Sequence, residues 1–142
     1  MRKISQPEFI PTRSFQFMHV LGSYFPQHRL IMTDFDMLPD AIPGKNSPVV
    51  QTRFENNTIA CDTYLVMPGM FDIFFPTDFG LFRDFYQIVL RSNAHASFQQ
   101  RKPKILTHRH FMETYGELEQ TRLRNGDNPL LLYYENCKFF LS

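Results

Sequence analysis

The sequence predicts an α/β fold in which a mixed sheet carries antiparallel additions. Short apolar runs alternate with segments whose apolar residues recur every three to four positions, which is typical of sheets covered by helices. Two β-like runs, 49–54 and 58–66, are separated by turn-forming residues and predict an antiparallel hairpin. Lys138–Leu141 predicts a terminal strand. Since the chain starts at a helix and offers only two strands of parallel type, the pattern resembles the second half of a doubly wound domain.

Composition places the chain among folded globular proteins of about one domain. It has 142 residues, of which 43% are hydrophobic and 20% are charged, so it is too apolar to be a disordered chain. The formal net charge is +1, without the basic character typical of a nucleic-acid-binding domain. No apolar run approaches the roughly 18–20 residues that span a bilayer. We therefore expect no nucleic-acid partner and no membrane span.

Cysteine and histidine spacing indicates neither a metal site nor a redox site. Cys61 and Cys137 are far apart in sequence and belong to no Cys-x-x-Cys pair. One disulfide is conceivable, but a secreted chain of this size usually carries more bridges, so we expect free, buried thiols in a reducing compartment. His108 and His110 cannot chelate together, because residues at i and i+2 point to different sides of a helix. The expected metal content is none.

The first predicted element is a helix capped by Thr12 and stopped by Pro26. Its apolar residues recur at i, i+3, i+4 and i+7, forming the stripe Phe17, Val20, Leu21 and Tyr24. Residues 1–30 are also rich in basic residues and serine, which loosely matches a mitochondrial transit peptide. The periodicity favours a folded helix, so no presequence is recognisable.

A buried strand over Arg29–Thr33 follows, and it ends in two acidic residues. Asp34 and Asp36 lie two residues apart, so they face the same side of an extended chain. Ligands of open α/β sheets bind outside the carboxyl ends of strands, which makes both residues substrate-side candidates. The alternative for Asp36 is that it opens the following proline-rich loop and hydrogen-bonds its own backbone.

Phe71–Phe75 predicts a second strand, and Thr77 can cap a helix that runs from Asp78 to about Leu90. The apolar stripe of that helix is Phe79, Phe82, Tyr86 and Val89. Asp72 and Asp78 flank the strand end and are two further substrate-side candidates. The alternative for Asp78 is an acid in the first helical turn, stabilised by the helix dipole.

The last third of the sequence predicts short elements. Residues 91–103 lose periodicity and indicate a surface loop. The elements expected after it are a strand at Lys104–Leu106, a helix capped by Thr107 and ended by Gly116, a polar helix over Glu117–Arg124, and a short helix opened by Asn128-Pro129.

Two blocks of sequence resemble one known family. The first is His28–Pro39 followed by Pro48–Arg53, and the second is Met67–Phe79. Together they are similar to the C-terminal half of the MidA-like methyltransferases, the mitochondrial complex I assembly family, in what looks like a fungal version. Asp34-Phe35-Asp36 matches the family's Asp-Tyr-Gly-like triplet. The family's Pro-Gly-x-x-Asp motif with a later Asp-Phe is matched by Pro68, Gly69, Asp72, Asp78 and Phe79. Its Thr-x-x-x-Phe helix start is matched by Thr107–Phe111.

The resemblance implies an S-adenosylmethionine-dependent enzyme with a Rossmann-like methyltransferase fold, which dimethylates a protein arginine symmetrically. It also implies a location in the mitochondrial matrix and a complex I subunit as the protein substrate. Two positions depart from the family pattern: Asp36 stands in place of a glycine, and Cys61 lies where a histidine is common.

The glycine-rich loop and the acidic ribose-binding residue of such enzymes have no counterpart in this sequence. The chain contains no G-x-G-x-x-G, P-loop, nucleophile elbow or H-E-x-x-H motif. We therefore expect residues 1–142 to form a single partial domain, the C-terminal half of a methyltransferase that lacks its cofactor-binding half. No cofactor-binding residue is assigned, and the catalytic residues are unknown.

A second class of function stays open from sequence. The chain could instead be a non-catalytic α/β protein-interaction module derived from the same fold. A glycine-rich strand–turn–helix encoded upstream would favour the enzyme over this module.

Overall fold

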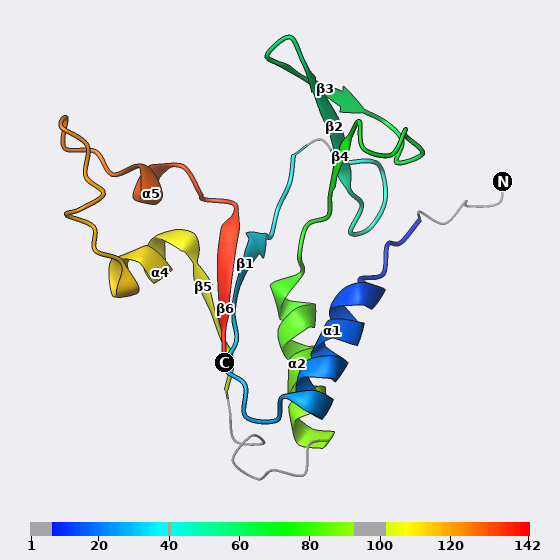
Figure 1. The fold of residues 1–142 in the computed structure, drawn as a ribbon, viewed down its shortest axis with the longest axis vertical. Coiled ribbons are helices and arrows are strands. Elements are labelled where there is room, and N and C mark those ends of the chain that lie inside the picture. Colours follow the sequence, from blue (N-terminus) through cyan, green and yellow to red (C-terminus); the bar gives the residue numbers. More distant parts are fainter. Residues whose placement is uncertain (1–6, 40, 93–101) are drawn as a thin grey trace, which may run out of the picture.

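The computed structural model describes residues 7–39, 41–92 and 102–142. Figure 1 shows a central sheet flanked by helices, with a smaller sheet at one end. The elements in chain order are α1 (Thr12–Tyr24), β1 (Ile31–Phe35), β2 (Val49–Phe54), β3 (Asn57–Cys61), β4 (Asp72–Phe74), α2 (Phe79–Ser92), β5 (Lys104–Thr107), α4 (His108–Tyr115), α5 (Pro129–Leu132) and β6 (Cys137–Leu141).

The central sheet has the order β1–β6–β5, and β6 runs antiparallel to both neighbours. β1 and β5 are therefore parallel to each other, with the last strand of the chain inserted between them. This arrangement confirms the predicted terminal antiparallel strand. Within the described residues the sheet has three strands, so a larger doubly wound sheet stays a prediction.

Helices lie on both faces of the central sheet. Successive residues of a strand point to opposite faces, and two neighbours on β6 show which helix covers which face. Phe140 is fully buried, with ring centroids 4.9 Å from Phe82 and 5.3 Å from Tyr86, both on α2. Phe139 stacks on Phe111 of α4, with centroids 3.7 Å apart. The α/β class is confirmed.

The helix α2 presents its predicted apolar stripe to the core, whereas α1 does not. The four stripe residues of α2 are all buried: Phe79, Phe82, Tyr86 and Val89. On α1, Phe17, Val20 and Tyr24 are 45%, 43% and 76% exposed, so the predicted stripe is wrong. The reason is Gly22, where an added Cβ would lie 2.4 Å from Val89 Cγ1. The closest helix–helix approach thus runs along Gly22 and the buried Met18.

The buried phenol of Tyr86 ties α2 to one end of the central sheet, where β1 begins and β6 ends. Its hydroxyl lies 2.6 Å from His28 Nε2, just before β1, and 2.7 Å from Ser142 Oγ, just after β6. A buried hydroxyl without partners would cost about 1–3 kcal/mol, so these two bonds satisfy the group and fix the helix over the sheet.

The smaller sheet has the order β3–β2–β4 and is antiparallel throughout. β2 and β3 form the predicted hairpin, although β3 ends at Cys61 rather than near residue 66. Glu55 and Asn56 close it with φ values of 46° and 65°. Positive φ at both central residues is the signature of a type I′ turn, which matches the twist of paired strands.

Two expectations about strands are wrong. β1 is not a buried strand, and Ile31 is 66% exposed, because among the described strands only β6 pairs with β1. β4 does not join β1 in a parallel sheet, because it pairs antiparallel with β2 and belongs to the smaller sheet. Both runs are apolar, which is why the sequence predicts them as two strands of one doubly wound domain.

The predicted helix caps are confirmed at α4 and α5 but not at α1. Thr107 and Asn128 accept hydrogen bonds from the backbone N–H of His110 and Leu130, at 3.2 and 3.0 Å, and so cap α4 and α5 as predicted. Thr12 does not cap α1, because Pro11 occupies the cap position and the Thr12 hydroxyl donates to the Ile10 carbonyl.

The predicted polar helix over 117–124 is wrong, because this segment forms turns. Asn128 Nδ2 donates to the Leu118 carbonyl and to Thr121 Oγ1, both at 2.9 Å, so the side chain of Asn128 holds the turns in place. The segment also lacks an apolar face whose burial would favour a helix. Most of the predicted loop at 91–103 lies outside the described residues, since residues 93–101 are not described.

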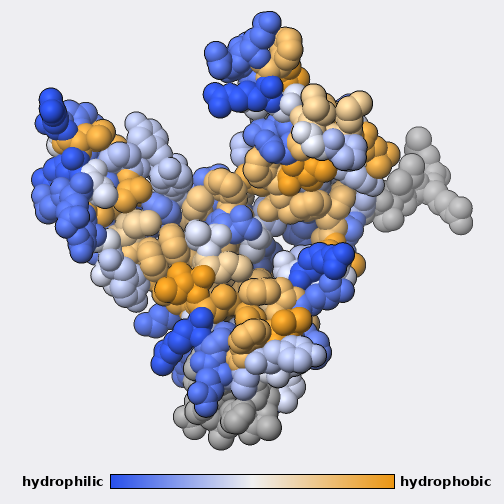
Figure 2. All heavy atoms as spheres, viewed as in Figure 1, coloured by the Kyte–Doolittle hydropathy of each residue, from blue (hydrophilic) through white to orange (hydrophobic). Residues whose placement is uncertain are grey.

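Figure 2 shows that the molecule is hollowed between two lobes. One lobe holds α4 and α5, and the other holds the smaller sheet, as comparison with Figure 1 shows. The carboxyl end of β1 points toward the smaller sheet, where the chain passes from β4 into α2 (Figure 1).

Candidate functional site

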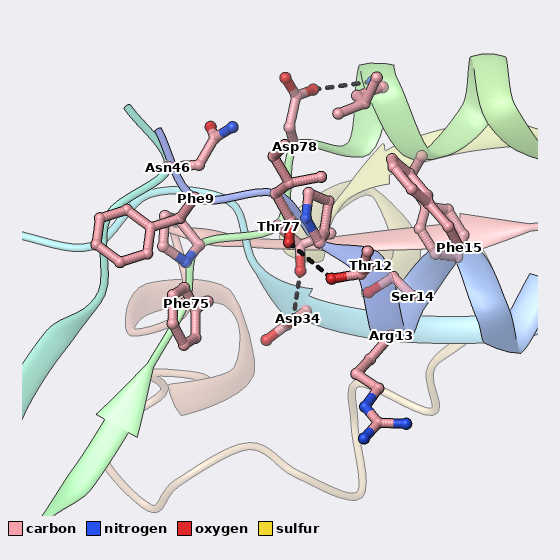
Figure 3. A pocket seen from close by; sticks show the side chains of 15 residues that line it. Phe9, Thr12, Arg13, Ser14, Phe15, Asp34, Asn46, Phe75, Thr77 and Asp78 are labelled. Carbon is pink, nitrogen blue, oxygen red and sulfur yellow. Dashed lines mark hydrogen bonds between the residues drawn. The ribbon is translucent and has the colours of Figure 1, made fainter. Parts of the chain in front are cut away.

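Asp34 lies near the carboxyl end of β1, where two backbone segments meet. Its Oδ1 accepts from the N–H of Phe35 at 2.8 Å, and its Oδ2 accepts from Thr77 Oγ1 at 2.6 Å. The N–H of Thr77 also donates to the Phe35 carbonyl at 2.8 Å. Thr77 therefore joins the start of α2 to the end of β1 at two points, and Figure 3 shows this pair at the centre of a pocket.

The first cavity is a pocket of about 350 Å³ beside this pair. Its wall is largely apolar and comes from three regions: the segment before and at the start of α1, the end of β4, and the first turn of α2. The polar lining residues are Thr12, Arg13, Ser14, Asp34, Asn46, Thr77 and Asp78. In Figure 3 the rings of Phe9 and Phe75 lie on one side of Asp34 and the ring of Phe15 on the other.

A second cavity, of about 450 Å³, lies beside Asp36, the second candidate acid near the carboxyl end of β1. Asp36 lines it and forms an ion pair with Lys138 of β6, with the carboxylate and ammonium 2.5 Å apart. The backbone N–H of Asp36 donates to the Asn136 carbonyl at 2.9 Å. Asp36 therefore continues the pairing with the chain ahead of β6 and does not bond to its own loop in the described structure.

Asp78 lines both cavities and also caps α2. Its Oδ1 accepts from the Leu81 N–H at 2.9 Å, and its carbonyl accepts from the Phe82 N–H at 2.9 Å. The cap of α2 is therefore Asp78 rather than Thr77, and the dipole interaction expected of an acid at this helix end applies. Thr77 and Asp78 lie on both cavity linings, so this segment separates the two spaces.

Asp72 does not join the other three candidates. It lies on β4 opposite Gln51 of β2, is exposed, and lines neither cavity. The structure thus brings Asp34, Asp36 and Asp78 to one region and leaves Asp72 on the smaller sheet.

Sequence reasoning did not find Thr77, Asn46 or Phe9 as site residues. The sequence predicts Thr77 as a helix cap, and that prediction gives no indication of its hydrogen bond to Asp34. Asn46, with φ 55°, and Phe9 lie in segments without periodicity. Their place in the pocket depends on contacts between parts of the chain that are distant in sequence.

Cys137 lies close to the candidate acids but is not an activated nucleophile. The thiol is buried, and it sits opposite Phe35 in the β1–β6 register. Burial, together with the negative charges of Asp34 and Asp36, raises the pKa of Cys137 above its ordinary value. The thiol therefore stays protonated at neutral pH. Both cysteines are free, with Cys137 buried as expected and Cys61 partly exposed.

In the described part of the chain, no cluster of three or more His, Cys, Asp or Glu residues is arranged to hold a metal ion. No helix among these residues is long and apolar enough to cross a membrane.

We expect Thr77→Val to loosen the Asp34 carboxylate and to lower the free energy of unfolding by about 1–2 kcal/mol. Valine keeps the shape of the side chain but removes a hydroxyl that bonds a charged group. Thr77→Ser, which keeps the hydroxyl, should recover most of the loss. Urea unfolding of the three proteins measures the difference. Equal stability of the valine and serine variants would show that the 2.6 Å bond contributes nothing.

Comparison with known proteins gives one family. Residues 2–98, more than half of the chain, match the model of a family described as "Putative S-adenosyl-L-methionine-dependent methyltransferase". The matched stretch contains the four candidate acids and most of both cavity linings. No curated protein and no solved structure matches the chain.

Proposed function

Because the chain belongs to this family of S-adenosylmethionine-dependent methyltransferases, we propose that it is the substrate-side half of a protein arginine methyltransferase. In this proposal residues 1–142 form the C-terminal part of a doubly wound domain, and the enzyme acts in the mitochondrial matrix on a complex I subunit. Family membership supports methyl transfer, and the resemblance of the blocks at 28–53 and 67–79 to the complex I assembly family supports the substrate and location.

The observation that carries the arginine assignment is the charge of the first cavity. In a pocket whose wall is largely apolar, Asp34 and Asp78 contribute two carboxylates and Arg13 contributes one cationic side chain. A side chain with an apolar stem and a cationic head would bury its methylenes against the wall and pair its charge with a carboxylate. An arginine side chain has this composition, and its planar fork suits carboxylates.

S-adenosylmethionine is the cofactor of the family, but the residues of this chain do not fit it. A nucleotide cofactor of this kind needs a glycine-rich turn between a strand and a helix, so that the backbone can approach it closely. Of the glycines with positive φ, Gly69 and Gly126 lie in surface turns, and Gly44 packs against the Pro7 carbonyl. We therefore assign this chain no cofactor-binding residue.

We expect the 142-residue chain alone to bind S-adenosylmethionine weakly or not at all, because it lacks the glycine-rich turn. Isothermal titration calorimetry with the purified chain measures this directly. Binding in the micromolar range would contradict the proposal that the cofactor binds to the other half of the enzyme.

The activity itself is tested with the complete enzyme and a labelled methyl donor. Incubation with a mitochondrial matrix extract should label a complex I subunit, and hydrolysis of that subunit should yield symmetric dimethylarginine. Labelling of lysine, of nucleic acid or of a small molecule would overturn the arginine assignment. The family membership would still stand in that case.

The alternative function, a non-catalytic interaction module, is favoured by the smaller sheet. Leu65, Met67 and Met70 next to this sheet are 80%, 69% and 61% exposed. Exposed apolar side chains gathered in one region are typical of protein-binding surfaces. An intact reading frame without any cofactor-binding half would favour this alternative over the enzyme.

A further inference from the structure

We propose that Phe9 and Phe75 form an aromatic wall in the first cavity that selects a guanidinium group, with Asp34 as its counter-ion. The inference rests on the proposed function, and it names the residues that would distinguish arginine from lysine. The cavity volume of about 350 Å³ is sufficient for one side chain.

The aromatic wall is assembled from two separate segments, and Tyr64, which does not line the cavity, packs against Phe9. Phe9 precedes α1, Phe75 follows β4, and Tyr64 lies in the connection after β3. The Phe9 ring is perpendicular to that of Tyr64 with centroids 5.7 Å apart, and it lies 5.9 Å from Phe75 at 56°. Phe75 is 49% exposed, so its ring is open to a ligand. Aromatic rings attract cations, and a planar guanidinium also stacks on them, which an ammonium group does not.

The Phe9 side of the wall is fastened to the loop at 44–46. Lys45 forms a parallel β-bridge with Glu8: the Phe9 N–H donates to the Lys45 carbonyl at 3.0 Å, and the Lys45 N–H donates to the Pro7 carbonyl at 2.9 Å. The Lys45 ammonium lies 2.8 Å from a Glu8 carboxylate oxygen, and this hydrogen bond raises the pKa of Lys45. The segment before α1 is therefore held across the pocket by three bonds.

The charges that face the pocket leave Asp34 able to bind a cation. Each carboxylate oxygen of Asp34 accepts one hydrogen bond, and a carboxylate has about four acceptor sites, so each oxygen keeps one. Arg13 also lines the pocket, but its Nη1 donates to Gln16 Oε1 at 3.2 Å on the exposed side of α1. In Figure 3 the Arg13 guanidinium points away from Asp34. The lining thus contains two carboxylates, Asp34 and Asp78, and one cation, Arg13, whose guanidinium points away from Asp34.

The test uses three small probes and ligand-observed NMR on the complete enzyme. The probes are n-propylguanidinium, its neutral isostere n-propylurea, and n-butylammonium. We expect the guanidinium to bind at least about 10-fold more tightly than the urea, because it alone carries charge. The ammonium should bind more weakly than the guanidinium. Equal binding of guanidinium and urea, or of guanidinium and ammonium, would overturn the proposal.

Substitutions then locate the effect. Phe9→Leu and Phe75→Leu keep apolar volume but remove the ring, and each should weaken guanidinium binding by about 3- to 10-fold while leaving urea binding nearly unchanged. The matched control is Phe25→Leu, at the far end of α1, where the ring is 58% exposed. Circular dichroism checks that each variant is folded. A similar loss in the control, or no loss in both pocket variants, would refute the aromatic wall.

Failure of this inference is distinguishable from failure of the proposed function. Guanidinium binding without methyl transfer by the complete enzyme would support the guanidinium site and contradict the proposed methyltransferase activity. Methyl transfer to arginine that is unaffected by Phe75→Leu would retain the enzyme and reject the pocket.

Discussion

Replacing Asp34 with asparagine should reduce methyl transfer by the complete enzyme about 100-fold or more, while the protein stays folded. In our proposal the Asp34 carboxylate pairs with the substrate cation. A preorganised charge in a partly buried site contributes several kcal/mol to stabilisation of the transition state. Steady-state kinetics with a labelled methyl donor measures the loss. Because the interaction is with the substrate cation, part of the effect should appear in KM.

The fold should tolerate this change because asparagine reproduces the local hydrogen bonds. Its carbonyl oxygen can accept from the Phe35 N–H, and its amide can donate to the hydroxyl of Thr77, which accepts in place of donating. The expected change in the free energy of unfolding is at most about 1 kcal/mol. Asp34→Ala lacks both bonds and should be clearly less stable than Asp34→Asn.

Asp72→Asn is the matched control, since it removes the same charge from an exposed site outside both cavities. Its activity should stay within about twofold of the parent enzyme. If Asp34→Asn melts many degrees lower but keeps its activity per folded molecule, Asp34 is a structural residue. Equal losses in both variants would mean that net charge matters and that the pocket does not.

Elements with strong local signals were predictable from the sequence. The stripe of α2, the caps at Thr107 and Asn128, and the hairpin turn at 55–56 depend on residues that are close in sequence, and the structure confirms them. The stripe of α1 was not predictable in this way. Its orientation depends on the contact of Gly22 with Val89, and hydrophobicity alone favours the opposite face.

Strand pairing was the least predictable feature of the fold. Phe71–Phe75 is apolar enough for a central strand, yet β4 pairs with β2 through the register Val50 to Ile73. An apolar run indicates that a strand is present but does not identify its neighbour. The partner is set by the chain between 49 and 74, where β2 pairs with β3 on one side and β4 on the other.

Site residues at the carboxyl ends of strands were predictable from the sequence. Site residues whose position depends on tertiary contacts were not. The rule for carboxyl ends of strands pointed to Asp34 and Asp36, and the structure places both beside cavities. Asp72 was a candidate because it flanks, with Asp78, the end of the predicted strand at 71–75, but β4 belongs to the smaller sheet and Asp72 lines neither cavity. Phe9 and Thr77 carry no sequence signal for the pocket, since their contacts with Phe75 and Asp34 join segments 66 and 43 residues apart in the chain.

We expect the 142-residue chain, expressed alone, to self-associate and to bind the dye ANS, because β1 leaves an open strand edge. Leu30 and Ser142 exchange hydrogen bonds at 3.4 and 3.0 Å, and the Asp36 N–H donates to Asn136 at 2.9 Å. Since bonded and non-bonded residues alternate in an antiparallel pair, the backbone groups of Ile31 and Thr33 point away from β6. No strand among the described residues pairs with that edge.

An open edge with an exposed apolar residue is a template for pairing with another chain. Ile31→Lys places a charge at this edge and should suppress both association and dye binding, as judged by sedimentation and ANS fluorescence. The control Ile88→Lys changes an equally apolar residue on α2, 61% exposed, and should leave both signals in place. Supplying the upstream half of the enzyme should suppress both signals as well, because its strands would cover the edge. A soluble monomer that melts cooperatively without binding the dye would refute the partial domain and favour a self-sufficient interaction module.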